Sequence, residues 1–528
     1  MAWFNAIIYF LYAIAIFIIY FLPGYLISKF HFFKFDKKEC ILFAFVFSSL
    51  LFAAIGLTVH IIGLIWSPIL LVIVFFISIL LFVYHKKNKT EIFELDKILL
   101  IIFLIQYLVF ITIQIFIPLY PLGGDHFTYY DSAKVFLNKE WNITIDMRDR
   151  APLYHFLIAF FMAIFGSDFW VAQIASTMMN SLVIIATFYL AEKFFNRKVA
   201  ILSMLMITVS PLMIESITYV WPKSFLAFFI LTFYYLLFTR KINFLFGLVS
   251  GLAFIAHPYS VAYIMPGILI LFLKTPKKNF FPILTFILIP TILLYIPWAL
   301  ANFLQYGSFV ASIPIKYYPF AVNGYEKLYE ETQAQIWKEF IETPILYIIG
   351  IRFVNAFTFL FPLTFFIPKI ISLFSPIQIK IHRLVDFSKQ PWTYNYVQTL
   401  AGGLTFLLFY FTCIGFIKLL KDKKKRELLI IMILSFIFFT SYIGFIQPLG
   451  RMAYVPLVPL SMMIGFNEVL TRKNSKRWIK LIFILAIVEC IVFAYFYSLN
   501  IDFTKNLAIK ANDQRYWDIY TAYKFFRN

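Results

Sequence analysis

The run Lys97-Ile-Leu-Leu-Ile-Ile-Phe-Leu-Ile-Gln106-Tyr-Leu-Val-Phe-Ile-Thr-Ile-Gln114-Ile-Phe-Ile117 decides the fold class of this chain. It is apolar for about 20 residues, the length that crosses roughly 30 Å of hydrocarbon as an α-helix. Similar runs recur along all 528 residues, of which 62% are hydrophobic and only 14% charged. They lack the alternating pattern of a lipid-facing barrel strand, and a helix satisfies its own backbone hydrogen bonds in lipid. The sequence therefore predicts an all-α polytopic membrane protein.

About fourteen spans are expected from hydropathy. They cover 3–27, 40–63, 67–84, 97–117, 169–190, 199–214, 224–240, 243–257, 260–273, 280–298, 398–418, 428–446, 452–470 and 479–498. The net charge of +20 comes from basic residues in the short loops between spans. Such loops are cytoplasmic by the positive-inside rule, so the charge indicates orientation and no nucleic-acid partner is expected. The N-terminus and the loop 118–168 then lie on the extracytoplasmic side, most simply of the plasma membrane.

Two apolar regions fall short of a span. The segment 151–165 is too short to cross comfortably, and a crossing there would place the basic residues after 192 outside; it is predicted as a helix lying at the interface. The region 301–397 makes no crossing or two for the same reason, and we expect an extracytoplasmic loop with interfacial helices. The expected units are N-terminal spans 1–96, a core 97–300, the loop region 301–397, C-terminal spans 398–500 and an extracytoplasmic tail 501–528.

The loop 118–168 concentrates the polar chemistry of the chain. It contains the sequence Gly124-Asp125-His126-Phe-Thr-Tyr129-Tyr130, and it holds six carboxylates, two arginines and two histidines. A membrane protein that gathers such groups at one bilayer surface is expected to act there on a lipid-borne substrate. Asp125 stands where a helix begins, so it either caps that helix or acts as a carboxylate kept ionised by the helix N-terminus.

The order of short motifs resembles a known family. The motifs are Gly-Asp125-His126-x-x-Tyr129-Tyr130, Arg150-Ala-Pro152-Leu-Tyr154, Ile-Phe165-Gly166 and Arg451-Met-Ala-Tyr454-Val-Pro456-Leu-Val-Pro459. Together they resemble the GT-C membrane glycosyltransferases related to protein O-mannosyltransferases and bacterial aminoarabinose transferases (glycosyltransferase family 39-like), over roughly 97–300 and 398–470. Two departures are His126, where the family usually has Glu, and a single proline after Arg150.

The resemblance implies a GT-C-like helix bundle and a sugar transfer. The donor would be a polyprenyl- or dolichyl-phosphate sugar, and the acceptor an extracytoplasmic protein, lipid or glycan. Asp125 would be the catalytic base of an inverting displacement, with Arg150, Arg451 and Arg148 holding the lipid phosphate. The alternative to phosphate binding is that these arginines only extend their charged groups to the membrane interface.

The remaining candidates are polar or aromatic residues at the same face. Substrate-binding candidates are His126, Tyr129, Tyr130, Asp146, Asp149, Tyr154, His155 and Lys223. The alternative to substrate binding by Asp146 and Asp149 is that they form local ion pairs with the neighbouring arginines, which contribute little to stability. No ligand set has zinc spacing, so no metal or cofactor is expected to be required, with a divalent cation kept open. The other functions kept open are a lipid-linked saccharide flippase or transporter and a polysaccharide polymerase or ligase.

Overall fold

A computed structural model describes most of the chain, and in these residues every regular element is a helix. The described residues are 2–30, 33, 35–36, 39–62, 69–88, 96–116, 125–137, 152–239, 244–276, 280–306, 333–346, 348, 403–422, 425–442 and 455–498. The predicted all-α class is confirmed. The tail 501–528 and most of 301–397 lie outside the described residues.

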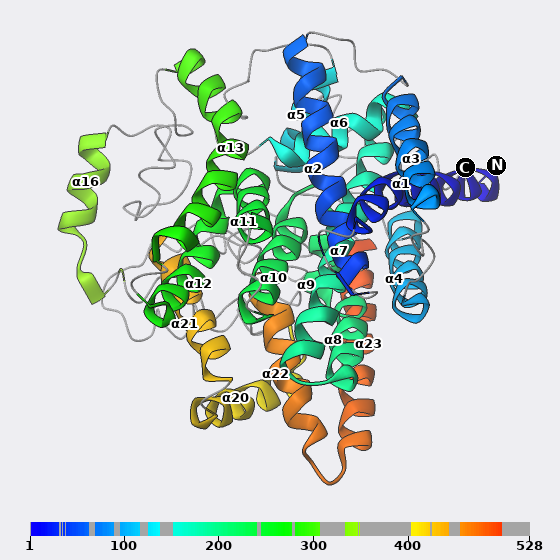
Figure 1. Ribbon diagram of the computed structural model, residues 1–528. Helices are drawn as coiled ribbons and strands as arrows, with labels where there is room; N and C mark the ends of the chain where they lie inside the picture. The colour runs from blue at the N-terminus through cyan, green and yellow to red at the C-terminus, as the bar shows by residue number, and fades with distance from the viewer. Residues whose placement is uncertain are drawn as a thin grey trace.

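Helices occupy each of the ranges in which a span was expected (Figure 1). They are α1 (Ala2–Ser28), α2 (Glu39–Ile62), α3 (Ile69–Lys87), α4 (Lys97–Phe116), α5 (Asp125–Leu137), α6 (Leu153–Phe165), α7 (Phe169–Phe194), α8 (Arg197–Thr208), α9 (Pro211–Thr218), α10 (Lys223–Thr239), α11 (Phe244–Ala256), η3 (Pro258–Ser260), α12 (Val261–Lys274), α13 (Phe280–Tyr306), α16 (Gln333–Glu342), α20 (Phe406–Lys421), α21 (Arg426–Tyr442), α22 (Leu457–Leu470) and α23 (Ser475–Ser498). By length and composition, six helices among the described residues could cross a membrane, or seven if a bent pair counts as one span. The count of fourteen spans therefore stays a prediction.

The expected span 199–214 is not one continuous helix. It divides into α8 and α9, which meet at an angle of 69°. Pro211 is the first residue of α9, and Ser210 before it has φ −99° and ψ 117°. Proline clashes with a helical conformation of the residue before it and offers no N–H to the preceding turn. The break thus follows from a proline inside an otherwise apolar run.

Helix α7 lies at the centre of the packing. Its most apolar segment is fully buried, whereas the corresponding segments of α3 and α13 are only 22% buried. A helix whose sides are all enclosed by protein is a core helix. The exposed aliphatic and aromatic side chains of α3 and α13 are those expected of helices that face lipid.

The N-terminal helices pack tightly onto this core. Gly24 of α1 faces α2 so closely that an added Cβ would lie 1.9 Å from the Ala44 carbonyl oxygen. Its N–H donates to Ser48 Oγ at 3.1 Å. Farther along α1, Ala13 O accepts a hydrogen bond from Tyr107 of α4. The segment 1–96 therefore shares one core with the helices that follow it.

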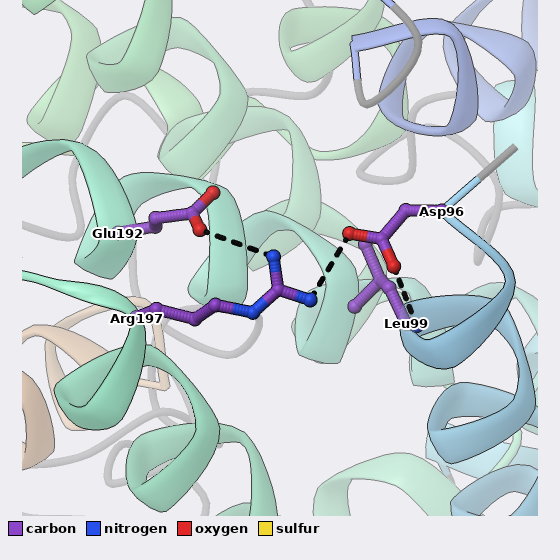
Figure 2. Close-up of polar contacts among 4 residues, drawn as sticks. All are labelled: Asp96, Leu99, Glu192 and Arg197. Carbon is purple, nitrogen blue, oxygen red and sulfur yellow. Dashed lines mark hydrogen bonds and ion pairs between the residues drawn. The ribbon is translucent and has the colours of Figure 1, made fainter.

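Ion pairs join helix ends that the sequence assigns to the cytoplasmic side. Figure 2 shows Arg197 between two carboxylates, 3.3 Å from Asp96 and 3.7 Å from Glu192. Asp96 also accepts the Leu99 N–H at the start of α4. On α22, Glu468 pairs with Lys418 at 2.9 Å. Exposed pairs such as Arg197–Glu192 contribute about 0–1 kcal/mol each, whereas the Glu468 carboxylate is buried. All of these pairs link ends predicted to lie on one side.

Candidate active site on the predicted extracytoplasmic side

Helix α5 begins at Asp125, as the sequence predicts. The side chains of Asp125 and His126 lie outside what the structure describes, as do Asp146, Arg148, Asp149, Arg150 and Arg451. Their assignments stay predictions. The backbone nevertheless fixes where α5 starts, and side chains four positions apart lie on one face of a helix. Tyr129 is therefore the described neighbour of Asp125 along that face.

Tyr129 packs against the helix expected in 151–165. Its ring stacks on His155 with centroids 5.0 Å apart and meets Tyr154 edge-on at 5.6 Å. Tyr130 points elsewhere, and its hydroxyl donates to Ser167 O at 2.7 Å. Tyr129, Tyr130, Tyr154 and His155 are all buried. The structure thus brings Tyr129, Tyr154 and His155 together, one helical turn from Asp125.

Helix α6 is enclosed rather than laid on a surface. Its residues are buried from Leu153 to Met162, and it packs against α2, α5 and α7. The predicted short helix is therefore present, and its burial makes it a rigid support for α5. The proline at 152 precedes the first turn, where a missing N–H costs nothing.

Tyr154 is a structural donor and acceptor, not a base. Its hydroxyl forms a hydrogen bond with Ser176 Oγ at 2.5 Å. Burial raises the pKa of the Tyr154 phenol well above its ordinary value, although hydrogen bonds from Ser176 and Asn180 oppose the shift. The phenol is consequently neutral near pH 7. Tyr154 can hold its neighbours in place but cannot accept a proton from a substrate.

Asn180 of α7 fixes the turn between α9 and α10. Its Nδ2 donates to Tyr219 O at 3.1 Å and to Trp221 O at 3.0 Å. Its Oδ1 accepts the Phe225 N–H at 3.0 Å. Ser176 Oγ adds a donor to Tyr219 O at 2.6 Å. One buried amide thereby satisfies backbone groups on both sides of a turn that has no regular structure, as buried polar groups require.

Lys223, the first residue of α10, is held directly after that turn. It is only 8% exposed, and its Nζ lies 3.0 Å from His257 Nε2. The same ammonium group lies 4.4 Å from the centre of the Tyr259 ring, a cation–π distance. The sequence predicted Lys223 as a binding candidate; the structure adds His257, which precedes η3.

Asn180 was missed by reasoning from the sequence, although a signal was present. Polar residues recur four positions apart within α7: Ser176 with Asn180, and Thr177 with Ser181. Residues at this spacing lie on one face of a helix. Thr177 also receives a hydrogen bond from Gln114 of α4 at 2.6 Å. Polar side chains inside an apolar span are costly unless partnered. Such a stripe therefore predicts a buried polar network.

No candidate metal cluster of three or more His, Cys, Asp or Glu side chains occurs among the described residues. Several predicted carboxylates of the loop 118–168 lie outside that part of the chain. Metal independence therefore stays a prediction.

Residues 149–300 match the model of the family described as dolichyl-phosphate-mannose-protein mannosyltransferase. The matched segment contains α6 to α12 and most of α13, and hence Tyr154, Asn180, Lys223 and His257. The resemblance inferred from the motifs is confirmed over this segment. No curated protein matches the sequence.

Solved membrane proteins match this chain at low sequence identity. The apo oligosaccharyltransferase of Archaeoglobus fulgidus is 15% identical, with a TM-score of 0.47 over 76% of this chain and 56% of that protein. ArnT from Cupriavidus metallidurans, solved bound to undecaprenyl phosphate, is 13% identical, with a TM-score of 0.43 over 81% of this chain and 75% of that protein. The chain thus spans little more than half the length of the archaeal enzyme.

Proposed function

We propose that the protein is a membrane glycosyltransferase that uses a polyprenyl- or dolichyl-phosphate-linked sugar at the extracytoplasmic face. The proposal is supported by the match of 149–300 to a mannosyltransferase family whose description names a dolichyl-phosphate sugar. The observation that carries it is the packing of α5 on this matched segment. Tyr129, one turn from Asp125, contacts Tyr154 and His155 of α6, so the helix that begins at Asp125 packs on the matched segment.

The reaction we propose is a single displacement with inversion. Asp125 removes the proton of the acceptor hydroxyl while that oxygen attacks C1 of the sugar. The bond from C1 to the phosphate oxygen breaks, and the lipid phosphate leaves with the added negative charge. Arg150, Arg451 and Arg148 are proposed to stabilise that charge. No separate acid is required, because a phosphate group leaves readily as an anion.

The aromatic and polar neighbours are assigned supporting roles. Tyr129 and Tyr130 are proposed to lie beside the sugar pocket, with His126, Asp146 and Asp149 near the acceptor. Tyr154 and His155 support α5 from behind, because Tyr154 already bonds Ser176 and both rings are buried. The acceptor is an extracytoplasmic protein, lipid or glycan, and polymerases and ligases belong to the same chemical class.

A lipid-linked saccharide transporter is the second candidate, favoured by one observation. Helices α8 and α9 form a pair broken by 69°, and broken helices often line transport sites. Sugar transfer by the purified protein in detergent, where no bilayer separates two compartments, distinguishes the two functions. A transporter moves the lipid-linked sugar across a liposome bilayer without cleaving its bond to phosphate.

The test is Asp125→Asn. Asn caps a helix about as well as Asp but accepts no proton, so turnover should fall by roughly 10²- to 10⁴-fold with little change in expression. The measurement is sugar transfer from a short-chain polyprenyl-phosphate donor to cell-envelope acceptors, with products identified by mass spectrometry.

Asp131→Asn is the matched control. Asp131 is on the same helix and partly exposed, and it has no assigned role in the reaction. Its substitution should change turnover by less than about threefold, the scale of an ordinary surface change of up to about 0.5 kcal/mol. Near-normal transfer by Asp125→Asn would remove Asp125 as the base.

A further inference from the structure

The start of α23 carries positive charge that the chain itself does not neutralise. The basic patch consists of Lys473, Lys476, Arg477 and Lys480, all of them exposed. Among the residues that the structure describes, none of the four takes part in an ion pair, whereas Arg197 at another helix end lies between two carboxylates. Lys476 and Lys480 are four positions apart, and like charges at this spacing destabilise a helix. The patch is therefore suited to an anionic ligand.

The neighbouring helices hold the patch in place without supplying the missing acid. Glu468 of α22 pairs with both Lys418 at 2.9 Å and Arg472 at 2.5 Å, so one carboxylate already serves two cations. Trp478 of α23 meets the Phe411 ring of α20 edge-on, with centroids 5.6 Å apart. Helix α20 and the turn between α22 and α23 lie at the same end of the molecule (Figure 1). The basic patch is thus part of a packed group of helix ends.

One face of α23 continues from these charges into exposed aliphatic residues. Ile484, Ile487 and Ile491 are 46%, 47% and 63% exposed. Together with Lys480 they follow the spacing i, i+4, i+7 and i+11, which places all four on one face of a helix. A long ligand on this face meets charge at one end and apolar surface beyond it.

The order of charge and apolar surface selects among anionic ligands. A free phosphate would use only the charges, and a soluble acidic peptide would leave the isoleucines uncovered. An anionic phospholipid matches both parts, with its headgroup at the lysines and its acyl chains along the isoleucines. Clusters of basic residues beside a membrane span attract such lipids.

We propose that the basic patch and the aliphatic face of α23 bind an anionic phospholipid. The patch belongs to the helix ends predicted to be cytoplasmic, so the lipid comes from the inner leaflet. Sugar transfer is assigned to the opposite side of the membrane. The inference is therefore independent of the proposed function and adds a second lipid site of different chemistry.

Lipid binding to the purified full-length protein in detergent tests the site. Native mass spectrometry measures the affinities for dioctanoyl phosphatidylglycerol, dioctanoyl phosphatidylcholine and glycerol 3-phosphate. The wild-type protein should bind phosphatidylglycerol at least about tenfold more tightly than either of the others, because two basic residues near a membrane surface already contribute roughly 25-fold. Lys476→Gln/Lys480→Gln should weaken phosphatidylglycerol binding by roughly 10- to 30-fold for the same reason and leave phosphatidylcholine binding unchanged.

Lys86→Gln/Lys87→Gln is the matched control. Both lysines are exposed at the end of α3, which is also predicted to be cytoplasmic, and exposed aliphatic residues such as Val83 precede them. This variant removes the same charge outside the basic patch and should change the affinity for phosphatidylglycerol by less than about threefold. An equal loss in the control would show general attraction of anionic lipid to the cytoplasmic side and overturn the proposal.

The other outcomes are decisive as well. Equal wild-type affinity for the two phospholipids would exclude recognition of the anionic headgroup. Equal affinity for glycerol 3-phosphate and phosphatidylglycerol would indicate a site for small anions and exclude a lipid site. If Lys476→Gln/Lys480→Gln does not fold, Lys473→Gln in the turn before α23 replaces it, with an expected loss of about fivefold. Unchanged affinity in the variant that folds would contradict binding at the basic patch.

Discussion

Replacing Asn180 by leucine should destabilise the protein and impair the site together. Leucine has a similar size, so packing within α7 changes little. The substitution removes the donor to Trp221 O at 3.0 Å and the acceptor for the Phe225 N–H at 3.0 Å. Tyr219 O loses one donor but keeps Ser176 Oγ at 2.6 Å. Ile217 O loses a longer contact of 3.3 Å. The main loss therefore falls on two buried backbone groups, Trp221 O and the Phe225 N–H.

The expected magnitude follows from those two groups. A buried polar group that loses its hydrogen bond costs about 1–3 kcal/mol, so Asn180→Leu should lower the unfolding free energy by about 2–6 kcal/mol. The loss falls on the turn that carries Lys223. We therefore expect slower sugar transfer by the fraction that remains folded. The assay is SDS-induced unfolding in mixed micelles, followed by tryptophan fluorescence.

Thr187→Val provides the control on the same helix. Thr187 is equally buried, but its hydroxyl bonds only the Val183 carbonyl one turn before it, where a threonine contributes little. This change should alter the unfolding free energy by less than about 1 kcal/mol. If Asn180→Leu costs no more than Thr187→Val, the turn before α10 is held by other contacts and the reasoning fails.

Three further predictions concern orientation, phosphate and packing. A cysteine at Asn142 should react with an impermeant thiol reagent in intact cells and one at Lys424 should not; the opposite labelling would reverse the orientation. Arg150→Ala and Arg451→Ala should each slow turnover, through a loss of about 2–4 kcal/mol of transition-state stabilisation. The Arg→Lys variants should be partly active. Normal kinetics in both alanine variants would indicate that these arginines only snorkel to the interface. Gly24→Leu should lower expression and thermal stability, because a Cβ there meets an α2 carbonyl oxygen at 1.9 Å; a fully stable variant would show that the two helices can separate without cost.

The helices could be predicted because few backbone conformations satisfy their own hydrogen bonds in lipid. An apolar run must satisfy its own backbone in the bilayer, so hydropathy alone locates α4 within a residue or two of its observed bounds. The break between α8 and α9 had a visible cause as well. Pro211 stands inside the expected span 199–214, near its end, and a proline there ends or bends a helix. The run simply looked continuous when judged by hydropathy alone.

The site was predictable only in part, because its contacts join residues far apart in the chain. Asp125, Tyr129 and Tyr154 belong to motifs that can be read in order along the sequence. The bond between Lys223 and His257 spans 34 residues and depends on how the ends of α10 and α11 meet. A lysine after a turn and a histidine before a proline look like ordinary helix-end residues on their own. Only the folded chain brings the two side chains to 3.0 Å, so the sequence could mark Lys223 as a binding candidate but could not indicate its neighbour.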